Sequence, residues 1–64
     1  MFQLEISTPQ GSIMSEEISS QEEIITIIKD GLESGKMTLM NDMGDVVLIT
    51  KGMMDSSVFF IKRV

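Results

Sequence analysis

The sequence predicts an α+β fold in which one helix packs on a small, mainly antiparallel sheet of four or five strands. Three features of the 64-residue chain support this prediction. Apolar and polar residues alternate near the N-terminus, a capped segment in the middle has helical periodicity, and the last third is rich in β-branched and apolar residues. The predicted order is a strand, an optional second strand, a helix and three strands, all within one domain over residues 1–64.

The first strand is predicted over residues 2–7, because apolar side chains at every second position fall on one face of an extended chain. A proline and a glycine then favour a turn over residues 8–12. Residues 13–18 are a candidate for a returning second strand. Glu16 and Glu17 interrupt its apolar pattern, so the sequence leaves both a strand and a loop open for this segment.

The helix is predicted to start near Ser20, because a capping box pairs an N-cap hydroxyl with a carboxylate three residues later. Glu23 occupies that later position, and Ser19 with Glu22 offers the same arrangement one residue earlier. Over residues 24–32, four isoleucines and one leucine fall within an arc of roughly 160°, which suits a helix that covers a sheet.

Two glycines mark the end of this helix. Gly35 is the expected left-handed C-cap residue, because glycine tolerates a positive φ. Gly31 lies one turn earlier, where it costs about 1 kcal/mol relative to alanine. We expect Gly31 either to permit a close approach of the helix to the sheet or to lie in a fraying last turn.

The second half of the chain predicts β structure, with strands over residues 37–40, 46–50 and 58–64. The run 46–50 is apolar and β-branched, which is typical of a central strand buried on both faces or at an interface. A loop of hairpin length that contains glycine precedes it at 41–45, and a connection follows at 51–57.

The apolar content exceeds what one helix hides, because a helix covers only one face of a sheet. We expect Val47, Ile49 and one of the two neighbouring phenylalanines to face water unless a further surface covers them. Symmetric association of identical chains is the commonest closed assembly that would cover them. The sequence therefore predicts a homo-oligomer, either a dimer or a larger assembly.

The composition argues against several classes of function. Cysteine, histidine, tryptophan and tyrosine are absent, so disulfides, Cys/His zinc sites and the commonest catalytic groups are missing. Ten acidic against five basic residues give a net charge of −5, which argues against nucleic-acid binding. We expect no catalytic residue, no cofactor and no metal site. The sequence has neither signal-peptide features nor an apolar run of the ~20 residues that span a bilayer, so we expect a cytoplasmic protein that does not bind membranes.

Charges and methionines are unevenly distributed along the chain. Residues 1–35 carry seven acids against one base, whereas residues 36–64 carry three acids against four bases. The acidic half is either a solvated helix and loop or a face that steers toward a basic partner. Four methionines in the second half lie at or beside predicted loops, where they either fill a small core or form a soft contact surface.

These features predict a non-enzymatic interaction protein that docks on another macromolecule. It would be a regulator or inhibitor of the kind that phages and other mobile elements encode. Carboxylates would orient it, while apolar strands and methionine-bearing loops would supply affinity. The candidate protein-interaction residues are Glu16, Glu17, Glu22, Glu23, Met40, Met43, Met53, Met54, Phe59 and Phe60.

Two alternatives stay open at this point. An oligomer of this chain could bind an anionic nucleotide or signalling molecule in pockets between subunits. The contacts would then come from basic residues of the second half, namely Lys36, Lys51, Lys62 and Arg63. The other alternative is a purely structural subunit of a larger assembly.

Overall fold

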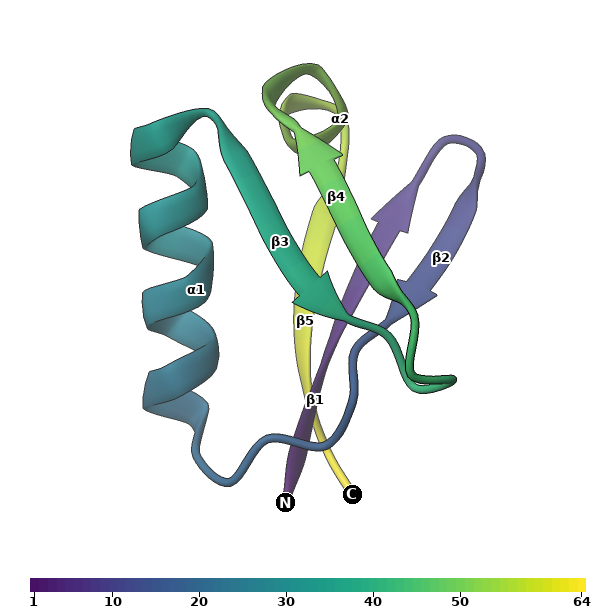
Figure 1. The fold of residues 1–64 in the computed structure, drawn as a ribbon, viewed down its shortest axis with the longest axis vertical. Coiled ribbons are helices and arrows are strands. Elements are labelled where there is room, and N and C mark those ends of the chain that lie inside the picture. The colour runs from purple at the N-terminus through teal and green to yellow at the C-terminus, as the bar shows by residue number, and fades with distance from the viewer.

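The computed structural model describes residues 1–64 and contains five strands, one long helix and one short helix. The strands are β1 (Phe2–Thr8), β2 (Gly11–Met14), β3 (Lys36–Met40), β4 (Val46–Thr50) and β5 (Val58–Arg63), and the helices are α1 (Gln21–Ser34) and α2 (Lys51–Asp55). The α+β class and the predicted order are confirmed, with α2 as an addition in the connection before β5 (Figure 1).

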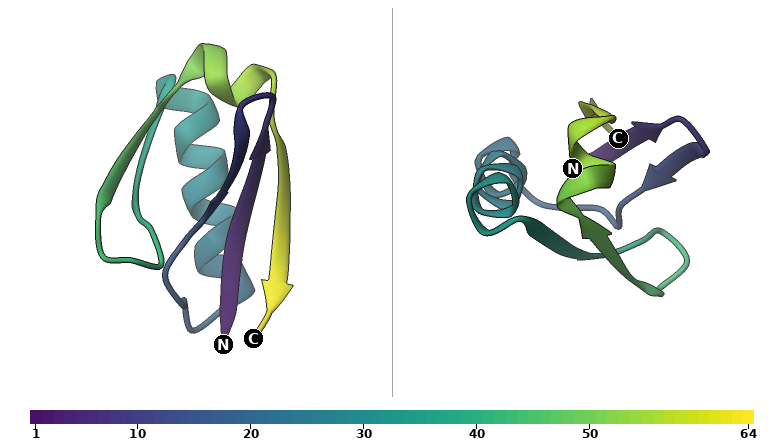
Figure 2. Two further views of the ribbon diagram at one scale, coloured as in Figure 1. Left: turned by 90° about the vertical axis from the view of Figure 1, so that its right-hand side faces the viewer. Right: turned by 90° about the horizontal axis from the view of Figure 1, so that it is seen from above.

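The five strands form two antiparallel sheets instead of one. β1 lies between β2 and β5 in a three-stranded sheet, and β3 pairs with β4 in a two-stranded sheet. α1 lies along one side of the molecule, and α2 crosses the end at which β4 finishes (Figure 2). The inner faces of the two sheets and of α1 together enclose the core.

The turn between β1 and β2 is short because one side chain closes it. The Thr8 hydroxyl accepts a hydrogen bond from the Gln10 N–H at 3.1 Å and donates one to the Gly11 carbonyl at 2.7 Å. Gly11 has a φ of 139°, a conformation that residues with a Cβ atom rarely adopt. The turn predicted from the proline and the glycine is therefore confirmed.

Ser15 ends the pairing of β2 with β1. Its N–H donates to the Leu4 carbonyl at 2.8 Å, as the antiparallel ladder requires. In the return direction, the Leu4 N–H donates to the Ser15 hydroxyl at 2.8 Å, and the Ser15 carbonyl accepts from the Gln3 side-chain amide at 2.9 Å. Because the hydroxyl replaces the backbone acceptor, the chain turns away from β1 without leaving a buried N–H unpaired.

The segment that follows β2 connects the two sheets. The Glu16 N–H donates to the Met40 carbonyl at 2.9 Å, and the Asp42 N–H donates to the Met14 carbonyl at 3.0 Å. Ile18 then returns to the first residue of β1 and exchanges two backbone hydrogen bonds with it. The segment that the sequence left open is thus a short strand ending at Met14, followed by a crossing with isolated bridges.

α1 begins at the predicted cap. The Ser20 hydroxyl accepts a hydrogen bond from the Glu23 N–H at 3.2 Å. The Glu23 carboxylate accepts from the Ser19 hydroxyl at 3.0 Å, so both serines of the predicted start hold this residue. Glu22 and Glu23 lie in the first turn, where the helix dipole favours negative charge.

α1 ends at Gly35, which has a φ of 81° and donates its N–H to the Gly31 carbonyl. Gly31 itself is buried against the two-stranded sheet. A Cβ atom on Gly31 would lie 3.1 Å from both the Cβ and the Cε atoms of Met37. Of the two explanations that the sequence offered for this glycine, close approach of the helix to the sheet is confirmed.

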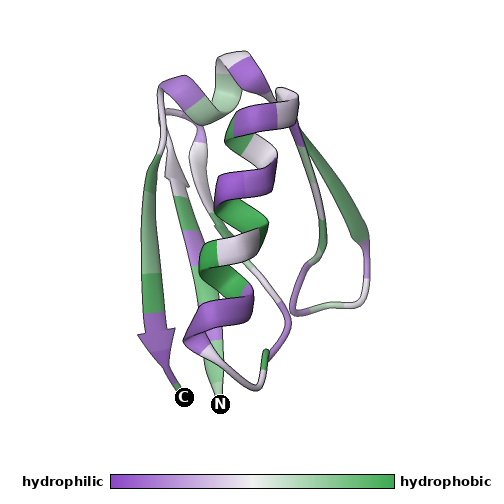
Figure 3. Cartoon of the chain, turned by 90° about the vertical axis from the view of Figure 1, so that its left-hand side faces the viewer, coloured by the Kyte–Doolittle hydropathy of each residue, from purple (hydrophilic) through white to green (hydrophobic).

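The core contains residues from every element except β2 and β5, with half-buried residues of those two strands packed around it. Its buried apolar residues are Leu4, Ile6, Ile24, Met37, Leu39, Ile49 and Met54. Coloured by hydropathy, α1 shows apolar and polar segments in alternation, as a helix with one apolar stripe does (Figure 3). This stripe is wider than the area that the sheets cover, because Ile25 and Leu32 stay exposed.

β4 is an edge strand with one buried face. Of the two alternatives for this run, a central strand buried on both faces is wrong, and a strand at an interface stays a prediction. Ile49 is buried and Val47 is half-buried on the inner face, where Val47 pairs with Leu39 of the core. Val46 and Leu48 are 69% and 65% exposed on the outer face. The expectation that Val47 and Ile49 face water is therefore also wrong, because the pairing with β3 turns the opposite set of side chains outward.

Candidate interaction surface

A largely apolar face lies on the outside of the two-stranded sheet. The β3–β4 register places Met40 beside Val46, and the next pair on the same side is Thr38 beside Leu48. All four side chains are exposed. We name this surface, together with Met43 in the following loop, the β3–β4 outer face.

The loop between β3 and β4 holds Met43 away from the core. The Asn41 side-chain carbonyl accepts hydrogen bonds from the N–H groups of Met43 at 3.0 Å and of Asp45 at 2.8 Å. Gly44 supplies the positive φ, 89°, that closes the turn. With its backbone fixed in this way, Met43 is 83% exposed and lies beyond the ends of the two strands.

A cleft of about 350 Å³ adjoins the β3–β4 outer face, between α1, β3 and the segment after β2. Its lining residues are Ser15, Glu16, Ile18, Ile27, Thr38, Leu39, Met40 and Val46. Glu16 is the only titratable side chain among them. The Ser15 hydroxyl is already engaged, since it accepts from the Leu4 N–H and donates to the Glu16 carbonyl at 2.8 Å. The cleft therefore offers apolar contact and one carboxylate, without a base placed beside a free nucleophile.

The four predicted carboxylates lie at the end of the molecule that also carries the β3–β4 loop (Figure 1). Glu16 and Glu17 belong to the segment between β2 and α1, and Glu22 and Glu23 belong to the first turn of α1. All four residues are exposed. Glu16 lines the cleft, while Glu22 and Glu23 line a second depression that shares Ile27 with it. Glu16 thus lines the apolar cleft itself, and Glu22 and Glu23 line the depression next to it.

The four predicted methionines do not form one surface. Met40 and Met43 lie toward the loop end of the two-stranded sheet, whereas Met53 and Met54 lie in α2 at the opposite end (Figure 1). Met54 is 2% exposed and belongs to the core, and Met53 is half-buried against it. The prediction of a contact surface is therefore wrong for Met54, which fills the core between the sheets.

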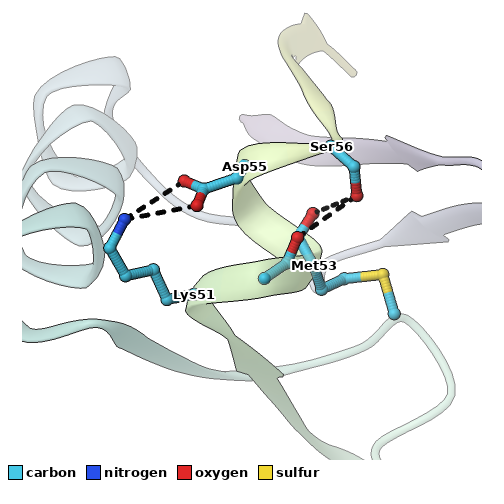
Figure 4. A network of polar contacts seen from close by, with 5 residues as sticks. Lys51, Met53, Asp55 and Ser56 are labelled. Carbon is cyan, nitrogen blue, oxygen red and sulfur yellow. Dashed lines mark hydrogen bonds and ion pairs between the residues drawn. The ribbon is translucent and has the colours of Figure 1, made fainter.

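α2 turns its charged side chains to water. The Lys51 Nζ atom lies 3.2 Å from the Asp55 carboxylate one turn later, and the Ser56 hydroxyl donates to the Met53 carbonyl at 3.2 Å (Figure 4). The Met53 side chain points away from this ion pair (Figure 4). The short helix therefore closes one end of the core and contributes little apolar surface to the outside.

The outer face of the three-stranded sheet has an ion pair at its centre. The Glu5 carboxylate lies 2.8 Å from the Lys62 Nζ atom. This hydrogen bond is the main reason why the pKa of Glu5 is lowered, and partial burial opposes it. Phe60 lies beside Glu5 and is exposed, as predicted for one of the two phenylalanines. Phe59 packs against the core, so it offers only part of its ring to a partner.

The basic residues of the ligand-binding alternative are divided between the two ends of the fold. Lys36 and Lys51 begin β3 and α2 at one end, whereas Lys62 and Arg63 finish β5 at the other (Figure 1). Carboxylates engage Lys51 and Lys62, and the Arg63 guanidinium lies 6.0 Å from the centre of the Phe2 ring. Within one chain, these four cations therefore do not converge on a common site.

Sequence reasoning missed Ser15 and the outward residues of β4. The available signal for Ser15 was a small hydroxyl residue at the position where the apolar pattern of residues 13–18 breaks. Val46 and Leu48 gave no signal, because a continuous run of apolar residues has no period that separates an inner from an outer face. Only the pairing with β3 determines which side chains face outward.

No helix in the structure is both long and apolar enough to cross a membrane. No group of three or more acidic side chains is placed so that it could hold a metal ion. No family model matches the sequence, and neither a curated protein nor a solved structure matches it. The function therefore has to be inferred from the residues themselves.

Proposed function

We propose that this chain is a non-enzymatic interaction protein, a regulator or inhibitor, which associates with itself and docks on another protein through the β3–β4 outer face. The position of Glu16 carries this proposal. Its N–H is bonded to the Met40 carbonyl at 2.9 Å, and its side chain lines the same cleft as Met40 and Val46. A carboxylate is thereby held beside large apolar side chains that face water.

This arrangement combines the two properties of a protein-docking surface. Docking would remove Met43, Val46 and Leu48 from water, which supplies affinity. The carboxylates around the cleft and beside the loop would stay at the rim, where charges guide the approach and the orientation of a partner. The partner that fits this surface is a protein with an apolar patch bordered by basic residues.

The extent of the exposed apolar surface supports self-association. Val58 and Phe60 on the outer face of the three-stranded sheet are exposed, in addition to the β3–β4 outer face. Small monomeric proteins rarely leave contiguous apolar patches open to water. A second copy of the chain would cover part of this surface and still leave room for another protein.

Affinity capture from the cells that produce the protein tests the docking surface. We expect the wild-type chain to retain a discrete partner at low salt, and the double variant Val46→Ser/Leu48→Ser to lose it. The matched control is Ile25→Ser/Leu32→Ser, which makes the same kind of change at exposed positions of α1 and should retain the partner. Circular dichroism establishes that each variant is folded.

The carboxylates are tested separately. Glu16→Gln/Glu22→Gln/Glu23→Gln should weaken capture at low salt and have little effect at high salt, because salt screens exposed charges. Capture that is unchanged in the apolar and carboxylate variants alike would contradict the proposal. Loss of the partner in the α1 control together with its retention in the β4 variant would also contradict the proposal.

A further inference from the structure

We infer that the free edge of β4 pairs with β4 of a second copy of this chain, antiparallel and around a twofold axis at Leu48. The inference rests on the self-association in the proposed function. It assigns that association to one strand edge and to one register. The β3–β4 outer faces of the two copies then form one continuous surface.

Four strands, β2, β3, β4 and β5, each pair with a single neighbour and so have a free edge. Part of two of these edges is occupied, because the Asp42 N–H bonds to the Met14 carbonyl of β2 and the Glu16 N–H bonds to the Met40 carbonyl of β3. β2 is also only four residues long, and short edge strands resist pairing with another chain.

β5 carries Lys62 and Arg63, and charged residues commonly protect an edge strand from pairing with another chain. From Val46 to Thr50, β4 contains no charged residue, no proline and no glycine. β4 is therefore the edge that lacks the usual protection.

Successive residues of β4 direct their backbone N–H and C=O groups alternately toward β3 and toward the open edge. In an antiparallel pair, every second residue directs its N–H and C=O groups to its partner strand. The Asn41 N–H donates to the Asp45 carbonyl, so the odd-numbered residues of β4 face β3. Val46 and Leu48 then present their N–H and C=O groups to the open edge. Thr50 presents its N–H there, while its carbonyl lies at the start of α2.

One symmetric register matches these groups. With the twofold axis at Leu48, the Leu48 residues of the two chains exchange backbone hydrogen bonds with each other. The Thr50 N–H of each chain then faces the Val46 carbonyl of the other chain. Symmetry repeats this Thr50–Val46 hydrogen bond at the opposite end of the paired strands. A shift of the register by two residues in either direction shortens the ladder.

Pairing also changes the surface on either side of the joined sheet. The Leu48 side chains of the two copies become neighbours, and apolar cross-strand pairs stabilise a sheet. The sheet of each copy continues into that of the other, so the docking surface is doubled. The β1–β2 hairpins lie on the core side of the sheet (Figure 2), so the hairpins of the two copies come alongside each other.

The absence of cysteine from the chain makes the register directly testable. The Cα atoms of a hydrogen-bonded antiparallel pair lie about 5.5 Å apart, within the range that a disulfide spans. We therefore expect Leu48→Cys to form a disulfide-linked dimer on mild oxidation. Val46→Cys is the matched control, because it has the same strand, face and exposure, yet its two copies lie on opposite sides of the axis and should not be linked.

Native mass spectrometry across a concentration series measures self-association itself. We expect a dimer of the wild-type chain and a dimer Kd at least about tenfold higher for Leu48→Lys, because two ammonium groups would face each other across the axis. Phe60→Lys makes the same change on the other sheet and should leave the Kd unchanged.

The outcomes separate this inference from the proposed function. A wild-type chain that stays monomeric at every concentration overturns the self-association and the inference together. Pairing of the β4 edge would then be possible only with a strand of another protein. A dimer that Phe60→Lys dissociates and Leu48→Lys does not keeps self-association and overturns the β4 edge. A dimer in which Val46→Cys is linked and Leu48→Cys is not overturns the register at Leu48.

Discussion

The two outer faces of the molecule are adapted to water in different ways. On the three-stranded sheet, Glu5 and Lys62 form an ion pair next to Phe60, so charge interrupts the apolar surface. On the β3–β4 outer face, Met40, Val46 and Leu48 lie together without a charged neighbour on their strands until Lys36. The two faces therefore differ in one respect that bears on the proposed docking: an ion pair interrupts the apolar residues of one, and none interrupts those of the other.

Replacing one leucine by alanine in each sheet should give the largest difference in the free energy of unfolding between the two sheets. Leu4, in the three-stranded sheet, is 1% exposed, whereas Leu48 is largely exposed. Leu4→Ala should lower the free energy of unfolding by about 2–5 kcal/mol, because it opens a cavity in the core. Leu48→Ala should change it by less than about 0.5 kcal/mol in a dilute monomeric sample. Urea unfolding measures both values, and equal losses would mean that Leu48 is covered in the folded monomer.

Ser15→Ala removes the hydroxyl that bonds to β1 at the point where the chain crosses to the other sheet. It leaves the buried Leu4 N–H without its acceptor, which should cost about 1–3 kcal/mol of unfolding free energy. The amide of Glu16, which donates to Met40, should also exchange its hydrogen faster. Thr26→Ala, an exposed change in α1, serves as the control and should stay within about 0.5 kcal/mol. A Ser15→Ala variant as stable as this control would contradict the structural role of the hydroxyl.

The ion pair should make the stability of the three-stranded sheet depend on pH. Because the pKa of Glu5 is lowered in the folded chain, the pair stabilises the fold above the ordinary glutamate pKa of 4.5, and this stabilisation is lost as the pH falls through the folded pKa. Lys62→Met removes the cause, so the wild-type chain should lose more stability than this variant between neutral and acid pH. Lys36→Met, on the other sheet, should lose as much as the wild-type chain does. Identical pH profiles for wild type and Lys62→Met would exclude the effect.

The smallest effect is expected in α2, which lies between the two sheets in the chain. Lys51 and Asp55 form an exposed ion pair one turn apart. Lys51→Met should lower the stability of the monomer by only about 0.3–0.5 kcal/mol, and the difference should disappear in high salt. A larger loss that persists in salt would show that Lys51 also supports the junction with β4.

The features that the sequence predicted correctly are those that a few neighbouring residues determine. The Ser20 cap and the Gly35 end of α1 depend on local hydrogen bonds and on φ, and both are found as predicted. The hairpin turn before β2 is another local feature. The order of the elements follows from the same local signals, because each element has its own period or cap.

The features that were predicted wrongly depend on which strand lies beside which. The pairing of β4 with β3 determines which β4 side chains face the core and which face water. A continuous run of apolar residues contains no information about this choice. The end of the β1–β2 pairing is marked by Ser15, whose role becomes visible only when Leu4 lies opposite it. For the candidate surface, the sequence identified Glu16, Met40 and Met43, and it missed the β4 residues beside them.

The crossing at Ser15 has a consequence for how the chain folds. The β1–β2 and β3–β4 hairpins each join strands that are close in sequence, and such hairpins form in about 1–10 μs. The bridge between Ser15 and Asn41 encloses α1 and β3, so it carries a larger loop-closure entropy. We therefore expect the union of two preformed hairpins to limit the rate of folding, and Ser15 to be a residue whose loss slows refolding more than it accelerates unfolding.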